Sequence, residues 1–232
     1  MAGRAPSWGG PGLGPQYSKT VLERRTQAER RDESRKRLIL AAMRLLGERG
    51  YARTSLVEIG REAGLSRGLV SHYFGSKEAC MRAVVEYIRT QTRQRTSDLG
   101  GHGEDAVDVI LDVYFDQVRA GHVEAKAMYV VLIEGLTATP GLRPAVADTN
   151  ALTRTFLAEC VAEMVDPRIP DPATHPQVMA IATLIEGILR GVALQWMADP
   201  DNVDLDAAKN TAKMMVRSAV TAIETVADLP SK

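Results

Sequence analysis

Polar residues of the types that bind polyanions are concentrated between Ser66 and Lys77. Ser66, Arg67 and Gly68 supply, in that order, a hydroxyl that can cap a helix, a long cation and an absence of bulk. This combination suits the leading end of a helix that enters a groove of DNA. The polar residues behind it that can reach phosphate oxygens or base edges are His72, Tyr73 and Lys77.

Two short helices joined by a glycine turn must position these residues. The capping box Ser55–Glu58 predicts that the first helix starts directly after Ser55. Gly64 ends that helix, and Ser66 caps the second one after a very short turn. Together with a longer helix that stops at Gly50, this is the sequence form of a helix-turn-helix. An ordinary three-helix bundle with solvated polar residues has the same pattern.

The order of residues from Leu45 to Glu78, LLGERGYARTSLVEIGREAGLSRGLVSHYFGSKE, strongly resembles the TetR/AcrR family of bacterial repressors. The resemblance covers roughly residues 30–85 and has almost no gaps. It implies an all-α fold with an N-terminal three-helix DNA-binding domain and a larger C-terminal helical domain for ligand binding and dimerisation. The DNA-binding residues that it implies are Thr54, Ser55, Ser66, Arg67, Gly68, His72, Tyr73 and Lys77.

The resemblance also assigns roles to single residues. Thr54 or Ser55 is expected to cap the helix-turn-helix and touch the DNA backbone, and Lys77 is expected to hold a phosphate. One departure is Ser71, where many members have tyrosine, so the contact made by that phenol is not carried over. The Ser-His-Tyr-Phe version at residues 71–74 resembles the branch that contains the choline-responsive betaine regulators.

The charge of the chain divides into a basic half and an acidic half. Net charge is zero, but residues 1–100 hold 19 Lys and Arg against 10 Asp and Glu. Residues 101–232 hold the other 10 Lys and Arg against 19 Asp and Glu. This asymmetry is consistent with one end that meets a polyanion. No secretory signal is recognisable and no apolar run reaches the length that crosses a bilayer, so we expect a cytoplasmic protein without membrane contact. Cys80 and Cys160 lie far apart and are expected to be reduced packing thiols.

Glycine and proline divide the chain into three predicted parts. Residues 1–27 are rich in both and lack apolar periodicity, which predicts a disordered arm. Residues 28–97 form the predicted helix-turn-helix domain and residues 104–228 the predicted ligand-binding and dimerisation domain, with a polar boundary between them. The periodicities are helical and strand signals are missing, so we expect an all-α fold. The helices expected after the boundary are 104–119, 122–137, 141–165, 174–198 and 204–227.

Two apolar stripes near the C-terminus predict a dimer. Each of the last two expected helices carries one, at spacings of three and four residues, and the second stripe consists mainly of small residues. Two such helices from each of two subunits would form a four-helix bundle. The alternative is that both stripes face the core of one subunit; the need of a helix-turn-helix for two half-sites favours the dimer. The predicted interface residues are Ile181, Ile185, Leu189, Val192, Trp196, Ala212, Met215 and Ala219.

A carboxylate inside an apolar run predicts a ligand cavity. Glu134 interrupts the run Met128–Leu136 and has no basic residue at helical pairing distance, so we expect it to line a cavity and to meet a cationic or hydrogen-bond-donating lipophile. The alternative is that Glu134 turns to solvent at a helix end. Glu186 lies in a similar run, but Arg190 can pair with it across the dimer seam. The residues expected to wall the cavity beside Glu134 are Tyr114, Met128 and Leu189.

Signatures of enzymes and cofactor sites are missing from the sequence: there is no phosphate-binding glycine loop, no pair of histidines on one helix and no nucleophile elbow. Asp108, Asp112 and Asp116 could form a metal ladder, but a solvated helix face is favoured. We expect no enzyme, metal or cofactor, but a homodimer that binds double-stranded operator DNA and leaves it when an unidentified small molecule binds. The alternatives are an architectural DNA-binding protein without a ligand and a helical protein whose basic half binds an acidic protein.

Overall fold

In a computed structural model the chain is built of helices, with no strand among the residues that the structure describes, 26–99, 105–121, 123–165 and 171–227. The all-α fold expected from the sequence is confirmed. The predicted arm lies outside the described residues up to residue 25, and so does the boundary at 100–104. The elements are α1 (Gln27–Arg49), α2 (Leu56–Glu62), α3 (Arg67–Phe74), α4 (Lys77–Asp98), α5 (Ala106–Arg119), α6 (Val123–Leu136), η2 (Pro140–Leu142), α7 (Arg143–Ala162), η3 (Pro172–Thr174), α8 (Pro176–Ala198) and α9 (Leu205–Ala227).

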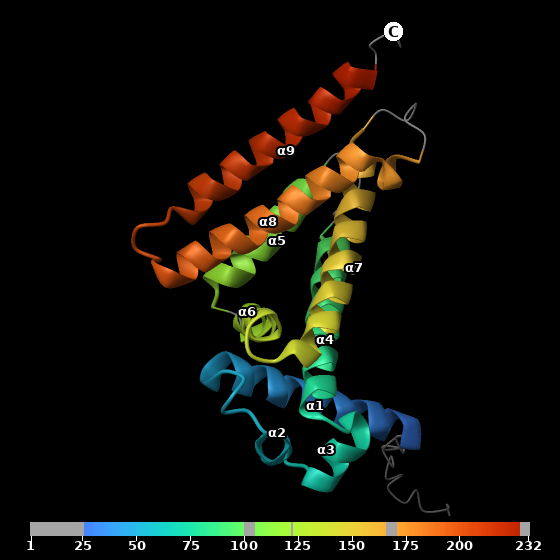
Figure 1. Cartoon of the computed structure of the whole chain (residues 1–232), viewed down its shortest axis with the longest axis vertical. Helices are drawn as coiled ribbons and strands as arrows, with labels where there is room; N and C mark the ends of the chain where they lie inside the picture. The colour runs from blue at the N-terminus through green and yellow to red at the C-terminus, as the bar shows by residue number, and fades with distance from the viewer. Residues whose placement is uncertain (1–25, 100–104, 122, 166–170, 228–232) are drawn as a thin grey trace, which may run out of the picture.

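Helices α1 to α3 and the start of α4 gather at one end of an elongated molecule (Figure 1). α1 begins with a capping box in which Thr26 and Glu29 bond to each other's backbone N–H groups, and it ends at Gly50, whose φ is +75°. The apolar faces of the four helices meet in one core. Its largest buried members include Leu38, Leu45, Leu46, Ile59, Val70, Met81 and Val84.

The long helix α4 connects this end to the rest of the molecule (Figure 1). Its first half, with Met81 and Val84, belongs to the core of the N-terminal end. Further along, it packs against α5 and α7. A rotation or shift of α4 would therefore displace side chains in both halves of the molecule.

Helices α5, α7, α8 and α9 enclose a second core, and Figure 1 shows α8 and α9 side by side at its edge. By length and composition α8 could cross a bilayer, contrary to the sequence expectation that no run is long enough. One side of α8, with Val178 and Ile185, is completely buried within the subunit, whereas Leu184 on another side is 64% exposed. The largest buried members of this core include Leu111, Phe115, Leu157, Val161, Ile185 and Leu189.

The acidic ladder on α5 is paired with basic residues of α9. Asp108 accepts a hydrogen bond from Arg217 at 2.9 Å, and Asp112 lies 2.8 Å from Lys213 and 3.1 Å from Lys209. These pairs join the two helices across the domain surface. Over the described part of the chain, no cluster of three His, Cys, Asp or Glu residues is placed to hold a metal ion.

Both cysteines are buried, one in each core. Burial raises the pKa of the Cys80 thiol to about 12 and the pKa of the Cys160 thiol to about 11. Both therefore remain neutral packing groups at physiological pH.

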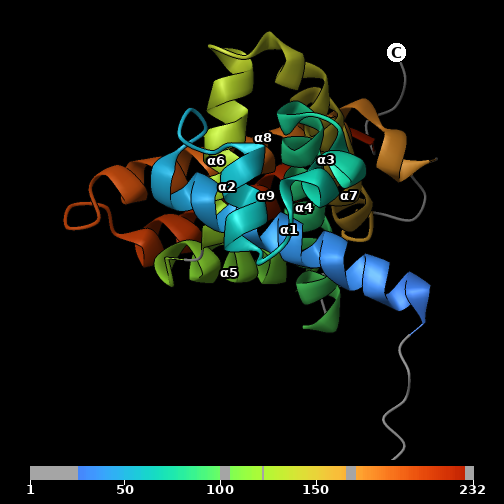
Figure 2. The same cartoon turned by 90° about the horizontal axis from the view of Figure 1, so that it is seen from below.

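Helix α6 lies between the two halves and contributes to the first core, although it belongs to the C-terminal part of the chain. Ala127 and Val131 are completely buried there, and Figures 1 and 2 place α6 against α1. The contact is close because α1 has a glycine at position 47: a Cβ there would lie 2.5 Å from Cγ2 of Val123.

We predict that Gly47→Ala destabilises the protein by about 1–3 kcal/mol, since the added methyl must displace Val123 in a packed contact. Urea denaturation followed by circular dichroism measures this. Gly68→Ala is the matched control, because a Cβ at Gly68 has only one neighbour within 4 Å, the Ser66 hydroxyl at 3.9 Å, and it should not lower stability. A Gly47→Ala variant as stable as the Gly68→Ala control would show that α1 and α6 are not closely packed.

Candidate functional site

The turn between α2 and α3 brings these helices into close contact. Gly64 has a φ of +64°, a backbone conformation that suits glycine. Beside it, the guanidinium of Arg37 donates a hydrogen bond to the carbonyl of Ala63 and ties the turn to α1. A Cβ at Gly60 would lie 3.0 Å from the carbonyl oxygen of Leu65. The two helices are thus held as the rigid pair that a helix-turn-helix requires.

Ser55, and not Thr54, caps the first helix of this pair. The Ser55 hydroxyl accepts from the backbone N–H of Glu58, whose carboxylate accepts from the Ser55 N–H at 3.0 Å. Thr54 is completely buried, and its hydroxyl donates to the carbonyl of Gly50 at 2.9 Å. The prediction that the Thr54 side chain touches DNA is therefore wrong. Ser55 is exposed and stays a predicted contact.

Helix α3 presents an exposed polar face opposite a buried anchor. Ser66 caps it by accepting a first-turn N–H, and Arg67 and Gly68 are exposed directly behind the cap. Val70 is completely buried against the core, which fixes the helix, while His72, two residues further on, is exposed. This face can enter a groove with Arg67 foremost.

Tyr73 has a structural contact as well as a predicted one with DNA. Its hydroxyl donates to the carbonyl of Arg31 at 3.0 Å, which joins α3 to the first turns of α1. That end of α1 carries exposed cations beside α3, the predicted recognition helix. The motif-based prediction missed these cations because they precede the motif. The basic excess of the first hundred residues was the available signal. These cations are Arg30, Arg31, Arg35 and Lys36.

Lys77 is directed at the loop between α1 and α2. Its Nζ donates to the carbonyl of Tyr51 at 2.7 Å and lies 3.7 Å from the centroid of the Tyr51 ring. Burial lowers the pKa of Lys77, although Glu134 and Glu78 oppose that shift. Because an ammonium has three N–H groups, two can still meet a phosphate, and the predicted contact stays a prediction.

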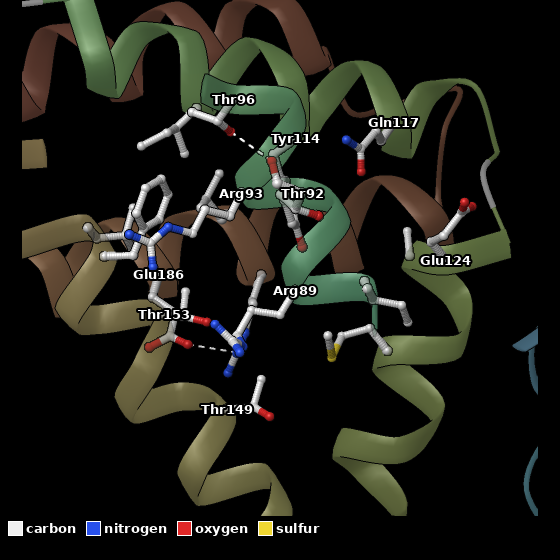
Figure 3. A pocket seen from close by; sticks show the side chains of 18 of the residues that line it. Arg89, Thr92, Arg93, Thr96, Tyr114, Gln117, Glu124, Thr149, Thr153 and Glu186 are labelled. Atoms are coloured by element: carbon white, nitrogen blue, oxygen red, sulfur yellow. Dashed lines mark hydrogen bonds and ion pairs between the residues drawn. The ribbon is translucent and has the colours of Figure 1, made fainter. Parts of the chain in front are cut away.

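A cavity of about 120 Å³ lies in the C-terminal half, walled by helices α4 to α8. Figure 3 shows the side chains from these helices converging on it. Tyr114, Met128 and Leu189 line it, but Glu134 does not. The carboxylate of Glu134 instead accepts a hydrogen bond from the Thr139 hydroxyl at 2.6 Å, beyond the end of α6. The cavity position predicted for Glu134 is wrong because α6 turns this residue toward the N-terminal domain, where its charge acts on Lys77 and Tyr51.

The carboxylate in the cavity wall belongs to Glu186. Glu186 is only 6% exposed and lies 2.7 Å from Arg190 and 3.5 Å from Arg154 of the same subunit. Burial raises the pKa of Glu186, and the two arginines oppose the rise. The pairing with Arg190 read from the sequence is present, but inside one subunit and not across a dimer seam.

Two further polar groups line the cavity. The hydroxyls of Tyr114 and Tyr129 lie 2.6 Å apart, and that of Tyr129 donates to the carbonyl of Arg190 at 3.1 Å. Burial raises the pKa of Tyr114 well above its usual value, so this hydroxyl stays protonated. Nε2 of Gln117 is buried without a hydrogen-bond partner among the described residues, so it is a donor available to a bound molecule.

Four of the predicted dimer residues, Ile181, Ile185, Leu189 and Ala212, are buried in the core of their own subunit, so that part of the prediction is wrong. Helix α8 is apolar on nearly every side, and a stripe at spacings of three and four does not identify which side a second subunit would cover. Met215 differs from the others, being 58% exposed on α9. Val192, Trp196 and Ala219 pack against this core but stay partly exposed, so their place in a dimer interface remains a prediction.

Comparison with known proteins identifies the N-terminal domain. The family model for "Bacterial regulatory proteins, tetR family" matches residues 38–84, which include α2, α3 and the start of α4. The HTH-type transcriptional regulator CymR of Pseudomonas putida is 26% identical over 84% of this chain and 95% of its own length. The HTH-type transcriptional regulator BetI of Stenotrophomonas maltophilia is 28% identical, over 68% of this chain and 80% of its own.

Solved structures share the fold over nearly their full length. A putative TetR-family regulator from Rhodococcus sp. has a TM-score of 0.70 at 17% identity and matches 82% of this chain and 99% of its own. The multidrug binding protein EbrR in complex with imidazole has a TM-score of 0.58 at 18% identity, over 85% and 97% of the two chains. The helix-turn-helix match, the full-length relatives and the shared fold agree: the N-terminal domain belongs to the TetR family of bacterial regulatory proteins, and the chain as a whole is similar to transcriptional regulators of that family, which are DNA-binding proteins and not enzymes.

Proposed function

We propose that this regulator is a cytoplasmic homodimeric repressor, and that a small molecule in the α4–α8 cavity releases it from a palindromic operator. The observation that carries the proposal is the double position of α6. Met128 and Tyr129 of α6 line the cavity, while Ala127 and Val131 of the same helix are buried in the core of the DNA-binding domain.

The coupling follows from close packing. A ligand that fits better when α6 is displaced favours the conformation in which α1 and α4 are displaced with it. In a dimer this changes the separation of the two recognition helices, which must match half-sites roughly 34–36 Å apart. The loss of operator affinity then equals the ligand's preference for the displaced conformation.

An exposed face of α8 and α9 supports the dimer. Its large apolar side chains lie in solvent in the single subunit, which is unusual for a stable monomer. Between them Gly187 and Gly191 of α8 face open space, since a Cβ on either would meet nothing within 4 Å. A second copy of the two helices can therefore approach closely and complete a four-helix bundle. The exposed apolar residues of this face are Leu184, Leu194, Met214 and Met215.

A second candidate is an architectural DNA-binding protein that takes no ligand. The cavity favours the first function, and so does EbrR, a neighbour described as a multidrug binding protein whose structure holds imidazole. Selection of bound sequences from a random DNA pool, followed by footprinting, tests the proposal. A palindromic footprint of defined spacing supports the repressor, whereas smeared protection without sequence preference contradicts it.

We predict that Arg67→Ala lowers affinity for the selected operator by about 1–3 kcal/mol and relaxes base preference at one position in each half-site, as expected when a guanidinium loses a base contact. Fluorescence anisotropy with operator and random duplexes measures this. Lys77→Ala is the comparison, because a lost phosphate contact should weaken both duplexes about equally and reduce the salt slope by about one per contact. If Arg67→Ala also weakens both duplexes equally, Arg67 does not read bases.

We predict that Leu184→Glu converts the dimer to monomers, because the substitution places unpaired charges inside the proposed bundle. Sedimentation velocity measures the oligomeric state, and operator affinity should fall with it. Ile133→Glu is the matched control, since Ile133 is similarly exposed but lies on α6. A Leu184→Glu variant that sediments as a dimer would place the interface elsewhere. Ile185→Glu cannot make this distinction, because Ile185 is completely buried within the subunit.

A further inference from the structure

We propose that the effector is a small apolar carboxylate whose carboxylate group is bound by the guanidinium of Arg89. This inference rests on the proposed function, since it names the chemical class of the molecule that enters the α4–α8 cavity. Arg89 lies half-buried on α4 and lines that cavity. Figure 3 shows it among the polar side chains that surround the cavity.

Arg89 differs from the other arginines in and beside the cavity. Over the described residues it makes no hydrogen bond, ion pair or ring contact, whereas the others each have a carboxylate partner 2.7–3.8 Å away. Arg93, one turn further along α4, also lies over the ring of Phe156. A guanidinium that borders a largely apolar cavity without a partner favours an anion there. The paired arginines are Arg93, Arg95, Arg154 and Arg190.

The charge around the cavity disfavours a cationic ligand beside Arg89. The buried carboxylate of Glu186 already has two guanidinium partners, Arg154 and Arg190. Glu124, which also lines the cavity, is paired with Arg95. An ammonium group entering beside Arg89 would therefore meet an excess of positive charge, and a carboxylate would reduce that excess.

The geometry of an arginine suits a carboxylate in particular. The planar guanidinium offers two parallel N–H donors that match the two carboxylate oxygens. Hydroxyls of Thr92, Thr149 and Thr153 line the same cavity, and the free amide N–H of Gln117 provides another donor on the α5 side.

The rest of the cavity wall is apolar and limits the size of the ligand. Its volume of about 120 Å³ is close to that of engineered apolar cavities that hold a benzene ring. A single ring or a short aliphatic chain therefore fits without rearrangement. The apolar wall residues include Ile88, Ile110, Met128, Leu132, Phe156 and Leu157.

The test uses three probes of nearly equal shape that differ in charge: benzoate, benzamide and benzylamine. Isothermal titration of the full-length dimer should give at least ten-fold tighter binding of benzoate than of benzamide, and no binding of benzylamine. Arg89→Gln should abolish the preference for benzoate while it leaves benzamide binding unchanged, which also shows that the variant is folded. Arg82→Gln is the control, because Arg82 is exposed on the same helix and does not line the cavity.

The outcomes separate the ligand class from the proposed function. Benzamide or benzylamine binding as tightly as benzoate, or an unchanged preference in Arg89→Gln, overturns the carboxylate site. If the neutral or cationic probe nevertheless lowers operator affinity, ligand-gated repression is supported although the carboxylate site is not. If benzoate binds through Arg89 but leaves operator affinity unchanged, the carboxylate site is supported. The proposal that a ligand in this cavity controls DNA binding is then overturned. Failure of all three probes to bind also overturns the carboxylate site, and it leaves gating by other molecules untouched.

Discussion

The packing of α6 against α1 is the contact on which the two halves of the molecule depend. The side chains of one helix serve two environments, with one face in the core beneath the recognition helix and the other against the cavity. Close-packed interiors have little free volume, so α6 cannot shift toward one side without disturbing the other. The glycine at position 47 brings the two helices close enough for this to hold. A domain that senses a small molecule and a domain that holds DNA thus share one structural element.

Several side chains that the motif predicts to contact DNA also make contacts that stabilise the DNA-binding domain itself. Tyr73 bonds to the backbone of α1, and Lys77 bonds to the backbone of Tyr51. The Thr54 side chain is completely buried inside the domain. The orientation of the recognition helix is therefore fixed by polar contacts as well as by the apolar anchor Val70. Substitutions at these positions change both the fold and the interface, whereas Arg67 is exposed and has no such second contact among the described residues.

The helix-turn-helix could be predicted from the sequence because its signals are local. Ser55, Ser66 and Ser76 each cap the helix that follows, and Gly64 adopts the positive φ that its turn requires. The same information fails for the C-terminal domain, where tertiary packing decides which side of a helix is covered. Glu134 and Glu186 lie in similar apolar runs, yet one turns toward the N-terminal domain and the other into the cavity wall. The arginines that surround the cavity come from helices far apart in the chain, so their grouping was not visible in any local pattern.

The burial of both cysteines makes this regulator insensitive to thiol chemistry. With the pKa of Cys80 at about 12 and that of Cys160 at about 11, almost no thiolate is present at neutral pH, and the thiolate is the species that oxidants and alkylating reagents attack. Peroxide or disulfide stress in the cell therefore has no direct route to its activity through these two thiols. For the same reason, thiol-reactive spectroscopic labels should not attach to the two native cysteines. A cysteine introduced on the exposed face of α3 or α9 can be labelled selectively, so that the separation of the two recognition helices can be followed without first removing the native thiols.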